Sequence, residues 1–159
     1  KATTPADILP RHFGHEESSV HMAEQLCARL KVPVDCRDLA SLMARYHGNI
    51  HRSSELRAAT IVGLFEKTDA LRRPARFQQL LDACLCDFTG RLGWEDRPYD
   101  SPQRLLAALV AVNAVDAGKI ALACSDKSKI PDRVRAARVA AVKALLNEPG
   151  DEPEQQGKE

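Results

Sequence analysis

The chain has 159 residues, of which 44% are hydrophobic and 28% charged, and its formal net charge is +1. This composition is typical of a globular protein, and the length suffices for one domain or two small ones. Because no apolar run approaches a membrane span and no signal peptide is visible, we expect a cytoplasmic protein with no membrane partner. The charge is uneven, since the last twelve residues carry −4 and the preceding body +5. A mildly basic body is compatible with a nucleic-acid partner.

Helical periodicity runs through the first half of the chain. We expect a short turn over residues 5–9, a helix over 15–30, and a second helix from 34 or 35 that ends at Gly48 and Asn49. Ser53 or Ser54 is expected to cap a third helix that ends near Thr68. A short turn then leads to Arg73.

The second half is predicted to be helical as well. Pro74 fits the first position of a long helix that Gly90 and Gly93 break, and the loop 93–99 is expected to pack back on the bundle. Helices are predicted over 101–116, weakly over 118–124, and from Pro131 to 147, with a polar loop at 125–129. The tail, residues 148–159, is expected to be disordered. No alternating strand pattern stands out, so the predicted fold class is all-α, a helical bundle.

The cysteines number five and have no CxxC spacing. Cys27, Cys36 and Cys84 fall on apolar helical faces, which predicts reduced, buried thiols rather than a zinc site or disulfides.

All five histidines lie between residues 12 and 51. On helices, His12 and His15 would share one face, and His47 and His51 another, so two helices could point imidazoles into one cleft. Imidazole suits metal binding and proton transfer near neutral pH. The alternative is that these are ordinary capping and surface histidines, and His21 is expected to face solvent.

Several segments together carry a resemblance to a known family. They are Leu9 to Glu16 with its Gly14-His15-Glu16, Ala23 to Pro33, Thr60 to Ala70, Arg73 to Phe77, Asp87 with Gly90, Arg91, Gly93 and Tyr99, and Arg138 to Val142. The order and spacing resemble the C-terminal part of bacterial CCA-adding tRNA nucleotidyltransferases of the HD-domain type. The resemblance implies the second half of an HD phosphohydrolase domain followed by a helical tRNA-binding region.

The resemblance also implies what the parent enzyme does. It adds CCA to tRNA 3′ ends from CTP and ATP, which would bind an N-terminal head, and its HD domain hydrolyses phosphoesters. The Gly-Ser signature and paired aspartates of the head are absent from these 159 residues. The His-Asp dyad of the HD site is expected immediately before Lys1. We therefore expect a fragment that has neither activity.

The resemblance further implies cofactors and site residues. The parent would use magnesium for nucleotidyl transfer and magnesium or nickel at the HD site, and the fragment is expected to bind neither tightly. His12, His15 and His47 are the candidates for metal or phosphate contacts. Glu16 and Glu17 could act as acid or base, or could simply complement the helix dipole.

Basic residues form the second candidate site. Lys and Arg on a helical face bind phosphates in a salt-dependent way, and the resemblance implies contacts with tRNA. The candidates are Arg72, Arg73, Arg76, Lys127, Lys129, Arg133, Arg135 and Arg138. A solvated amphipathic face is the alternative, because acidic residues are interspersed.

The predicted domains are residues 1–73, the HD portion, residues 74–147, the tRNA-binding region, and residues 148–159, the tail. The two helical parts could share one core. Two other functions stay open: a stand-alone metal-dependent HD phosphohydrolase, and a non-catalytic helical module that binds RNA or protein.

Overall fold

The computed structural model describes residues 14–147, and these form seven α-helices and two short 3-10 turns. In order they are α1 (His15–Leu30), α2 (Val34–His51), η1 (Ser53–Glu55), α3 (Ala58–Thr68), α4 (Pro74–Thr89), α5 (Ser101–Asn113), α6 (Ala117–Leu122), η2 (Lys127–Lys129) and α7 (Ile130–Asn147). No strand occurs within this range. The predicted all-α fold is therefore confirmed. The turn expected at residues 5–9, His12 and the tail lie outside the described residues.

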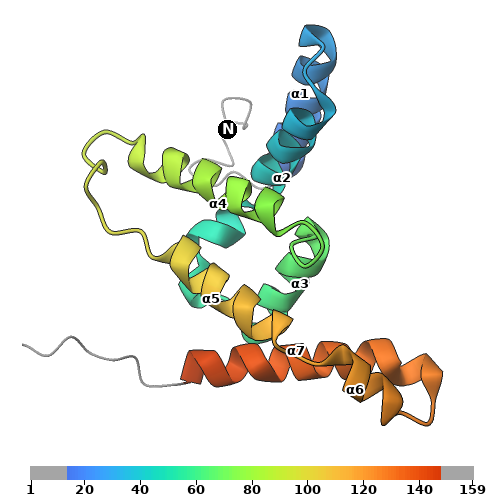
Figure 1. The fold of residues 1–159 in the computed structure, drawn as a ribbon. Coiled ribbons are helices and arrows are strands. Elements are labelled where there is room, and N and C mark those ends of the chain that lie inside the picture. Colours follow the sequence, from blue (N-terminus) through green and yellow to red (C-terminus); the bar gives the residue numbers. More distant parts are fainter. Residues whose placement is uncertain (1–13, 148–159) are drawn as a thin grey trace, which may run out of the picture.

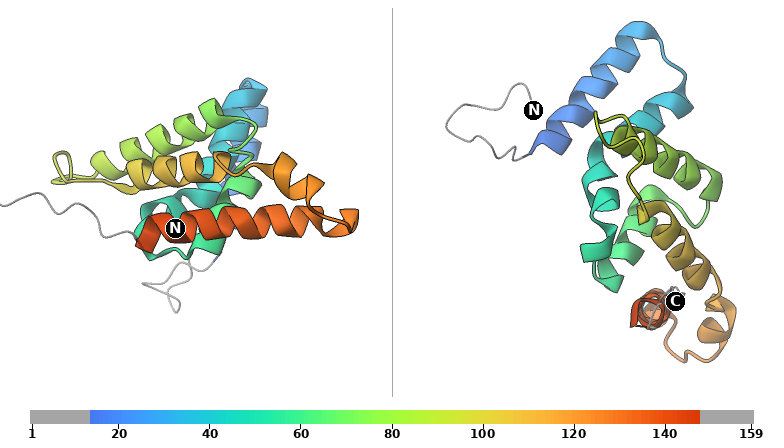
Figure 2. Two further views of the ribbon diagram at one scale, coloured as in Figure 1. Left: turned by 60° about the horizontal axis from the view of Figure 1, so that its bottom comes forward. Right: turned by 90° about the vertical axis from the view of Figure 1, so that its left-hand side faces the viewer.

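The helices form an elongated arrangement. The hairpin of α1 and α2 lies at one end, α7 with α6 at the other, and α3, α4 and α5 lie between them (Figures 1 and 2). The end of α2 packs against α4, while α3 and α5 pack against α7. Along residues 14–147, no helix is both long and apolar enough to span a bilayer.

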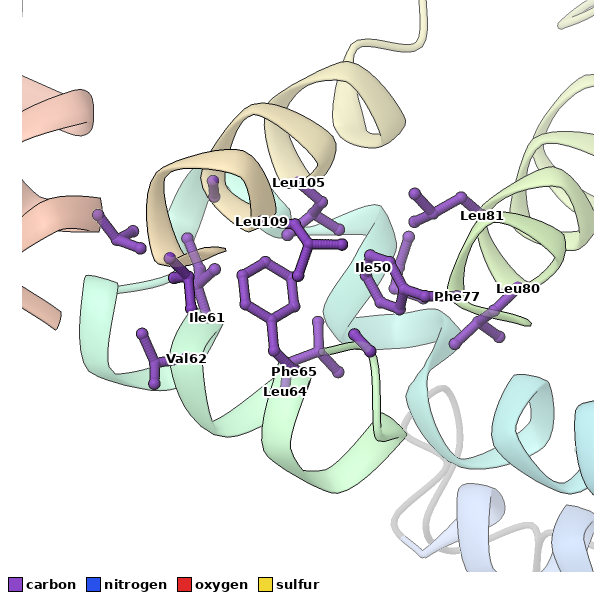
Figure 3. Close-up of a cluster of buried hydrophobic side chains, with 14 of the residues drawn as sticks. Ile50, Ile61, Val62, Leu64, Phe65, Phe77, Leu80, Leu81, Leu105 and Leu109 are labelled. Carbon is purple, nitrogen blue, oxygen red and sulfur yellow. The ribbon is translucent and has the colours of Figure 1, made fainter. Parts of the chain in front are cut away.

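The hydrophobic core lies where α3, α4 and α5 meet (Figure 3). Phe65 and Phe77 are almost fully buried, and their rings meet edge to face with centroids 5.4 Å apart, a favoured aromatic geometry. Ile50 from α2 and Val142 from α7 complete the core with no exposed surface. The core thus draws residues from both sides of residue 73, and the domain boundary there stays a prediction.

Most predicted helix starts and ends are close to the observed ones, and three are wrong. Helix α2 continues through Gly48 and Asn49 to His51, because the burial of Ile50 keeps the last turn helical. Ser53 begins a 3-10 turn, and α3 starts only at Ala58 without a side-chain cap. Helix α5 ends at Asn113 rather than near residue 116.

The early end of α5 has a local cause. Asp116 caps the next helix instead, its Oδ1 accepting a hydrogen bond of 2.9 Å from the backbone N–H of Lys119. Side chains of this type satisfy the free N–H groups of a helix start.

The predicted burial of Cys27, Cys36 and Cys84 is confirmed only in part. All five cysteines are free thiols, and Cys27, Cys84 and Cys124 are buried. Cys36 is exposed, contrary to the prediction, because it lies near the start of α2 where the α1–α2 hairpin extends beyond the rest of the bundle.

Candidate functional site

Three of the five histidines form a row along the end of α2 and the start of α1. The ring centroids of His15 and His47 are 5.8 Å apart, and those of His47 and His51 are 6.0 Å apart. His47 and His51 are one helical turn apart, so they share a face as the sequence predicted. His12 lies outside the described residues, and His21 is exposed.

His15 occupies the first position of α1, directly after Gly14. Gly14 has a φ of 70°, in the left-handed region that glycine adopts without strain, and this turn directs the chain into the helix. The Nδ1 of His15 lies 3.2 Å from a carboxylate oxygen of Glu16, and four-fifths of its side chain is buried. Glu16 and Glu17 lie in the first turn of α1, where acidic residues complement the helix dipole.

His47 is held in one tautomer by its own helix. Its Nδ1 lies 3.1 Å from the carbonyl of Met43 and 3.2 Å from that of Ala44. Because carbonyls only accept, Nδ1 must carry the proton, which leaves the lone pair on Nε2. A backbone carbonyl bound in this way is the usual support of a metal-binding imidazole.

His51 has both of its ring nitrogens engaged. Its Nε2 lies 2.7 Å from Asp87 Oδ2 on α4, and its Nδ1 lies 2.9 Å from the hydroxyl of Tyr99. The carboxylate accepts from Nε2–H, so Nδ1 accepts from the tyrosine hydroxyl. We name this arrangement of His51, Asp87 and Tyr99 the His51 clamp, because it joins α2, α4 and the loop before α5.

The clamp perturbs the ionisation of its members. Burial lowers the pKa of His51, and the hydrogen bond with Asp87 offsets this only in part. For Asp87, burial alone would raise the pKa, but the hydrogen bonds from His51 and Arg91 outweigh it and lower the pKa. Burial raises the pKa of Tyr99. The preferred state is therefore a neutral imidazole between a carboxylate and a phenol.

An aromatic cluster supports the clamp. Tyr99 stacks on Phe88 with centroids 4.4 Å apart, and Trp94 meets Phe88 at 4.9 Å. The guanidinium of Arg97 lies 4.6 Å from the centre of the Trp94 ring, a cation–π distance. The loop that carries Trp94 and Tyr99 therefore packs back on α4, as predicted.

The described residues form no cluster of three side chains of the kinds that usually bind a metal. Across residues 14–147, no three side chains of His, Cys, Asp or Glu are placed to share one ion. Catalytic zinc sites, for comparison, use three protein ligands. His15 and His47 could supply two, but both nitrogens of His51 are committed to the clamp. No catalytic step through a metal follows from these residues alone.

The predicted RNA-binding residues fall into separate groups. Arg72, Arg73 and Arg76 gather around Asp69 at the turn between α3 and α4, with nitrogen-to-carboxylate distances of 2.7, 3.5 and 4.0 Å. The Asp69 carboxyl has a lowered pKa because Arg72 donates a hydrogen bond to it.

The remaining basic candidates lie in η2 and along α7. Lys127, Lys129 and Arg133 are exposed, and Lys129 pairs with Asp126. Arg135 reaches back to Glu66 on α3 at 3.2 Å. Arg138 is partly buried, so less of it is available to a ligand than of the others.

Sequence reasoning missed the partners in the clamp. In the sequence, Asp87 and Tyr99 are marked only by the resemblance. They lie 36 and 48 residues from His51, so no local spacing connects them. An i, i+4 pair of Asp87 and Arg91 was readable from the sequence and is present at 2.9 Å.

The fold and the site together define a class of protein. It is an all-helical protein with a row of histidines, a carboxylate beside that row, and separate groups of basic side chains. The chain is 74% identical over 156 residues to a multifunctional CCA protein of Dechloromonas aromatica, a match that covers 98% of the chain. It is 59% identical over 147 residues to the multifunctional CCA protein of Cupriavidus necator, and 55% over 151 residues to that of Aromatoleum aromaticum. Over nearly its whole length the chain is therefore similar to multifunctional CCA proteins, which confirms the resemblance seen in the sequence.

The chain spans 36–38% of the length of these three relatives. No protein-family model matches it. No solved structure matches it either.

Proposed function

We propose that this chain is the C-terminal part of an enzyme that adds CCA to the 3′ ends of tRNA from CTP and ATP. The observation that carries the proposal is that the chain is similar to multifunctional CCA proteins over nearly its whole length, with 74% identity to the one from Dechloromonas aromatica. In this proposal CTP and ATP bind the N-terminal part of the parent, tRNA is the shared partner, and the enzyme works in the cytoplasm.

The contribution of this chain is twofold in our proposal. Its helices contact tRNA through basic side chains, and its histidine row completes a metal-dependent phosphohydrolase site that the preceding segment begins. His47 supports the second role, because its Nδ1 is held by backbone carbonyls and its Nε2 keeps a lone pair. Magnesium or nickel would bind only when the preceding segment supplies further ligands.

The isolated chain is accordingly expected to be inactive. The test measures hydrolysis of bis(p-nitrophenyl) phosphate by the chain with added magnesium or nickel, beside a His15→Ala variant as control. Turnover in the chain that clearly exceeds the variant would contradict the expectation. In the parent enzyme, His47→Gln should abolish hydrolysis while nucleotide addition to tRNA continues, because only hydrolysis would use the histidine row.

A stand-alone phosphohydrolase is the second candidate, and the convergence of His15 and His47 favours it. The coding sequence upstream separates the two candidates. A nucleotidyltransferase head before Lys1 supports the CCA-adding enzyme, whereas a start codon shortly before the histidine–aspartate dyad supports the hydrolase.

A further inference from the structure

A cavity lies where the α1–α2 hairpin meets the turn between α3 and α4. Its volume is about 660 Å³, and four helices line it. None of the histidines between residues 14 and 147 lines this cavity, so it is separate from the histidine row. Its charged lining residues are Glu24 on α1, Arg37, Asp38 and Arg45 on α2, Lys67 on α3 and Arg76 on α4.

The positive charges of this cavity are only partly compensated. Asp38 pairs with Arg37 at 3.2 Å. Arg45 pairs with Glu17 at 3.1 Å, and both of these side chains are exposed. Lys67 forms no ion pair with any residue between 14 and 147, and it is exposed. Because exposed pairs exchange readily with other ligands, an anion that enters the cavity could recruit both Arg45 and Lys67.

One of these cations is fixed in position. Arg76 donates a hydrogen bond of 3.0 Å from its Nη2 to the carbonyl of Thr68, and the same Nη2 lies 4.0 Å from a carboxylate oxygen of Asp69. About four-fifths of the Arg76 side chain is buried. A guanidinium that is already ordered loses little conformational entropy when it binds an oxyanion. The cavity therefore combines a positioned Arg76 with the more exposed Arg45 and Lys67.

A second cavity continues the first. It has a volume of about 330 Å³, it shares Tyr46 and Lys67 with the first, and it extends along α3 to Thr60. Arg135 from α7 also lines it and pairs there with Glu66 at 3.2 Å. On α2 alone, Arg37 and Arg45 are eight residues apart, which is about 12 Å along the helix axis. A path of this length with cations spaced along it suits a chain of phosphates better than a single small anion.

We propose that these two joined cavities, which we name the Lys67 groove, bind the phosphate backbone of tRNA. The proposal rests on the proposed function, and it identifies where on the helices the RNA lies. Arg45, Lys67 and Arg76 neutralise successive phosphates. The phenol of Tyr46 and the amide of Asn49 offer hydrogen bonds beside them. Contacts of this kind release counterions and carry no sequence preference.

The experiment measures the affinity of the 159-residue chain for an unmodified tRNA transcript by fluorescence anisotropy at several salt concentrations. The test variant is Arg45→Gln/Lys67→Gln. The control is Lys119→Gln/Lys143→Gln, which removes the same charge from exposed lysines that line neither cavity. The charge-preserving variant Arg45→Lys/Lys67→Arg guards against a change in folding, and far-UV circular dichroism compares the helix content of all variants.

The Lys67 groove predicts that the test variant loses at least about tenfold in affinity and that its salt slope falls by about two, one for each lost phosphate contact. The control should lose less than about twofold, and the charge-preserving variant should bind like the original chain. Equal losses in test and control variants would overturn the groove and leave the proposed function intact. Failure of the original chain to bind tRNA in a salt-dependent way would overturn the groove and the tRNA contact together. If the groove pattern holds but the parent enzyme adds no nucleotides, only the proposed function fails.

Discussion

Replacing Asp87 by Ala tests whether the His51 clamp stabilises the fold. The substitution removes the acceptor of the 2.7 Å hydrogen bond from His51 and of the 2.9 Å ion pair with Arg91. It also leaves the half-buried Nε2–H of His51 without a partner. The change creates little cavity, because 42% of the Asp87 side chain is exposed.

The expected magnitude follows from these contacts. A hydrogen bond to a charged group contributes about 1.5–3 kcal/mol, and solvent screening at a partly exposed carboxylate reduces this to about 1–2 kcal/mol. The i, i+4 pair with Arg91 adds about 0.3–0.5 kcal/mol. We therefore expect Asp87→Ala to lower the free energy of unfolding by about 1.5–2.5 kcal/mol. With a urea m-value of about 2 kcal/mol/M, the midpoint falls by about 1 M.

The assay is urea unfolding followed by circular dichroism and by the fluorescence of Trp94, the one tryptophan of the chain. Asp82→Ala on the same helix is the control, since Asp82 accepts an exposed hydrogen bond from Gln78 and no other from residues 14–147. It should cost less than about 0.5 kcal/mol. If both variants unfold at the same urea concentration, the clamp contributes nothing to stability and the reasoning is refuted.

Three further predictions concern pH, the core and the thiols. The pKa of His51 is lowered in the folded state, so below about pH 6.5 the unfolded chain binds more protons than the folded chain. The free energy of unfolding, measured in urea, should therefore fall as the pH is lowered from 7.5 to 5.5. The fall should be smaller in His51→Gln. Phe65→Ala should lower the free energy of unfolding by about 3–5 kcal/mol, whereas the exposed Val110→Ala should lower it by less than about 1 kcal/mol. Burial raises the pKa of the Cys84 thiol to about 12, so its reactive thiolate form is scarce in the folded chain. Iodoacetamide should therefore modify the exposed Cys36 and Cys86 in the native chain, and Cys84 only after unfolding. Mass spectrometry of the labelled chain checks this.

The sequence predicts the helices well because their signals are local. Pro74 at the start of α4 and the pair Ser101 and Pro102 at the start of α5 lie where the first turn tolerates proline. The errors occur where tertiary packing overrides a local signal. Gly48 and Asn49 look like a helix end, yet the buried Ile50 continues α2 past them.

The candidate site is less accessible to sequence reasoning. Spacing on one helix predicts that His47 and His51 share a face, and the position of His15 beside them depends on the packing of α1 against α2. The grouping of basic residues depends on the same packing. Lys67, Arg76 and Arg45 come from three helices and share one cavity, and no sequence spacing brings them together.

The different fates of His47 and His51 show how packing assigns roles to like residues. Both lie on one face of α2, and both were plausible metal ligands on spacing alone. The Nδ1–H of His47 bonds to backbone carbonyls one turn earlier in α2, so the lone pair on its Nε2 stays uncommitted. Asp87 and Tyr99 reach His51 from α4 and from the following loop and occupy both of its nitrogens. The last turn of α2 therefore serves two purposes: His47 is poised to bind a ligand, while His51 holds the α2 end against α4 and so keeps His47 in place.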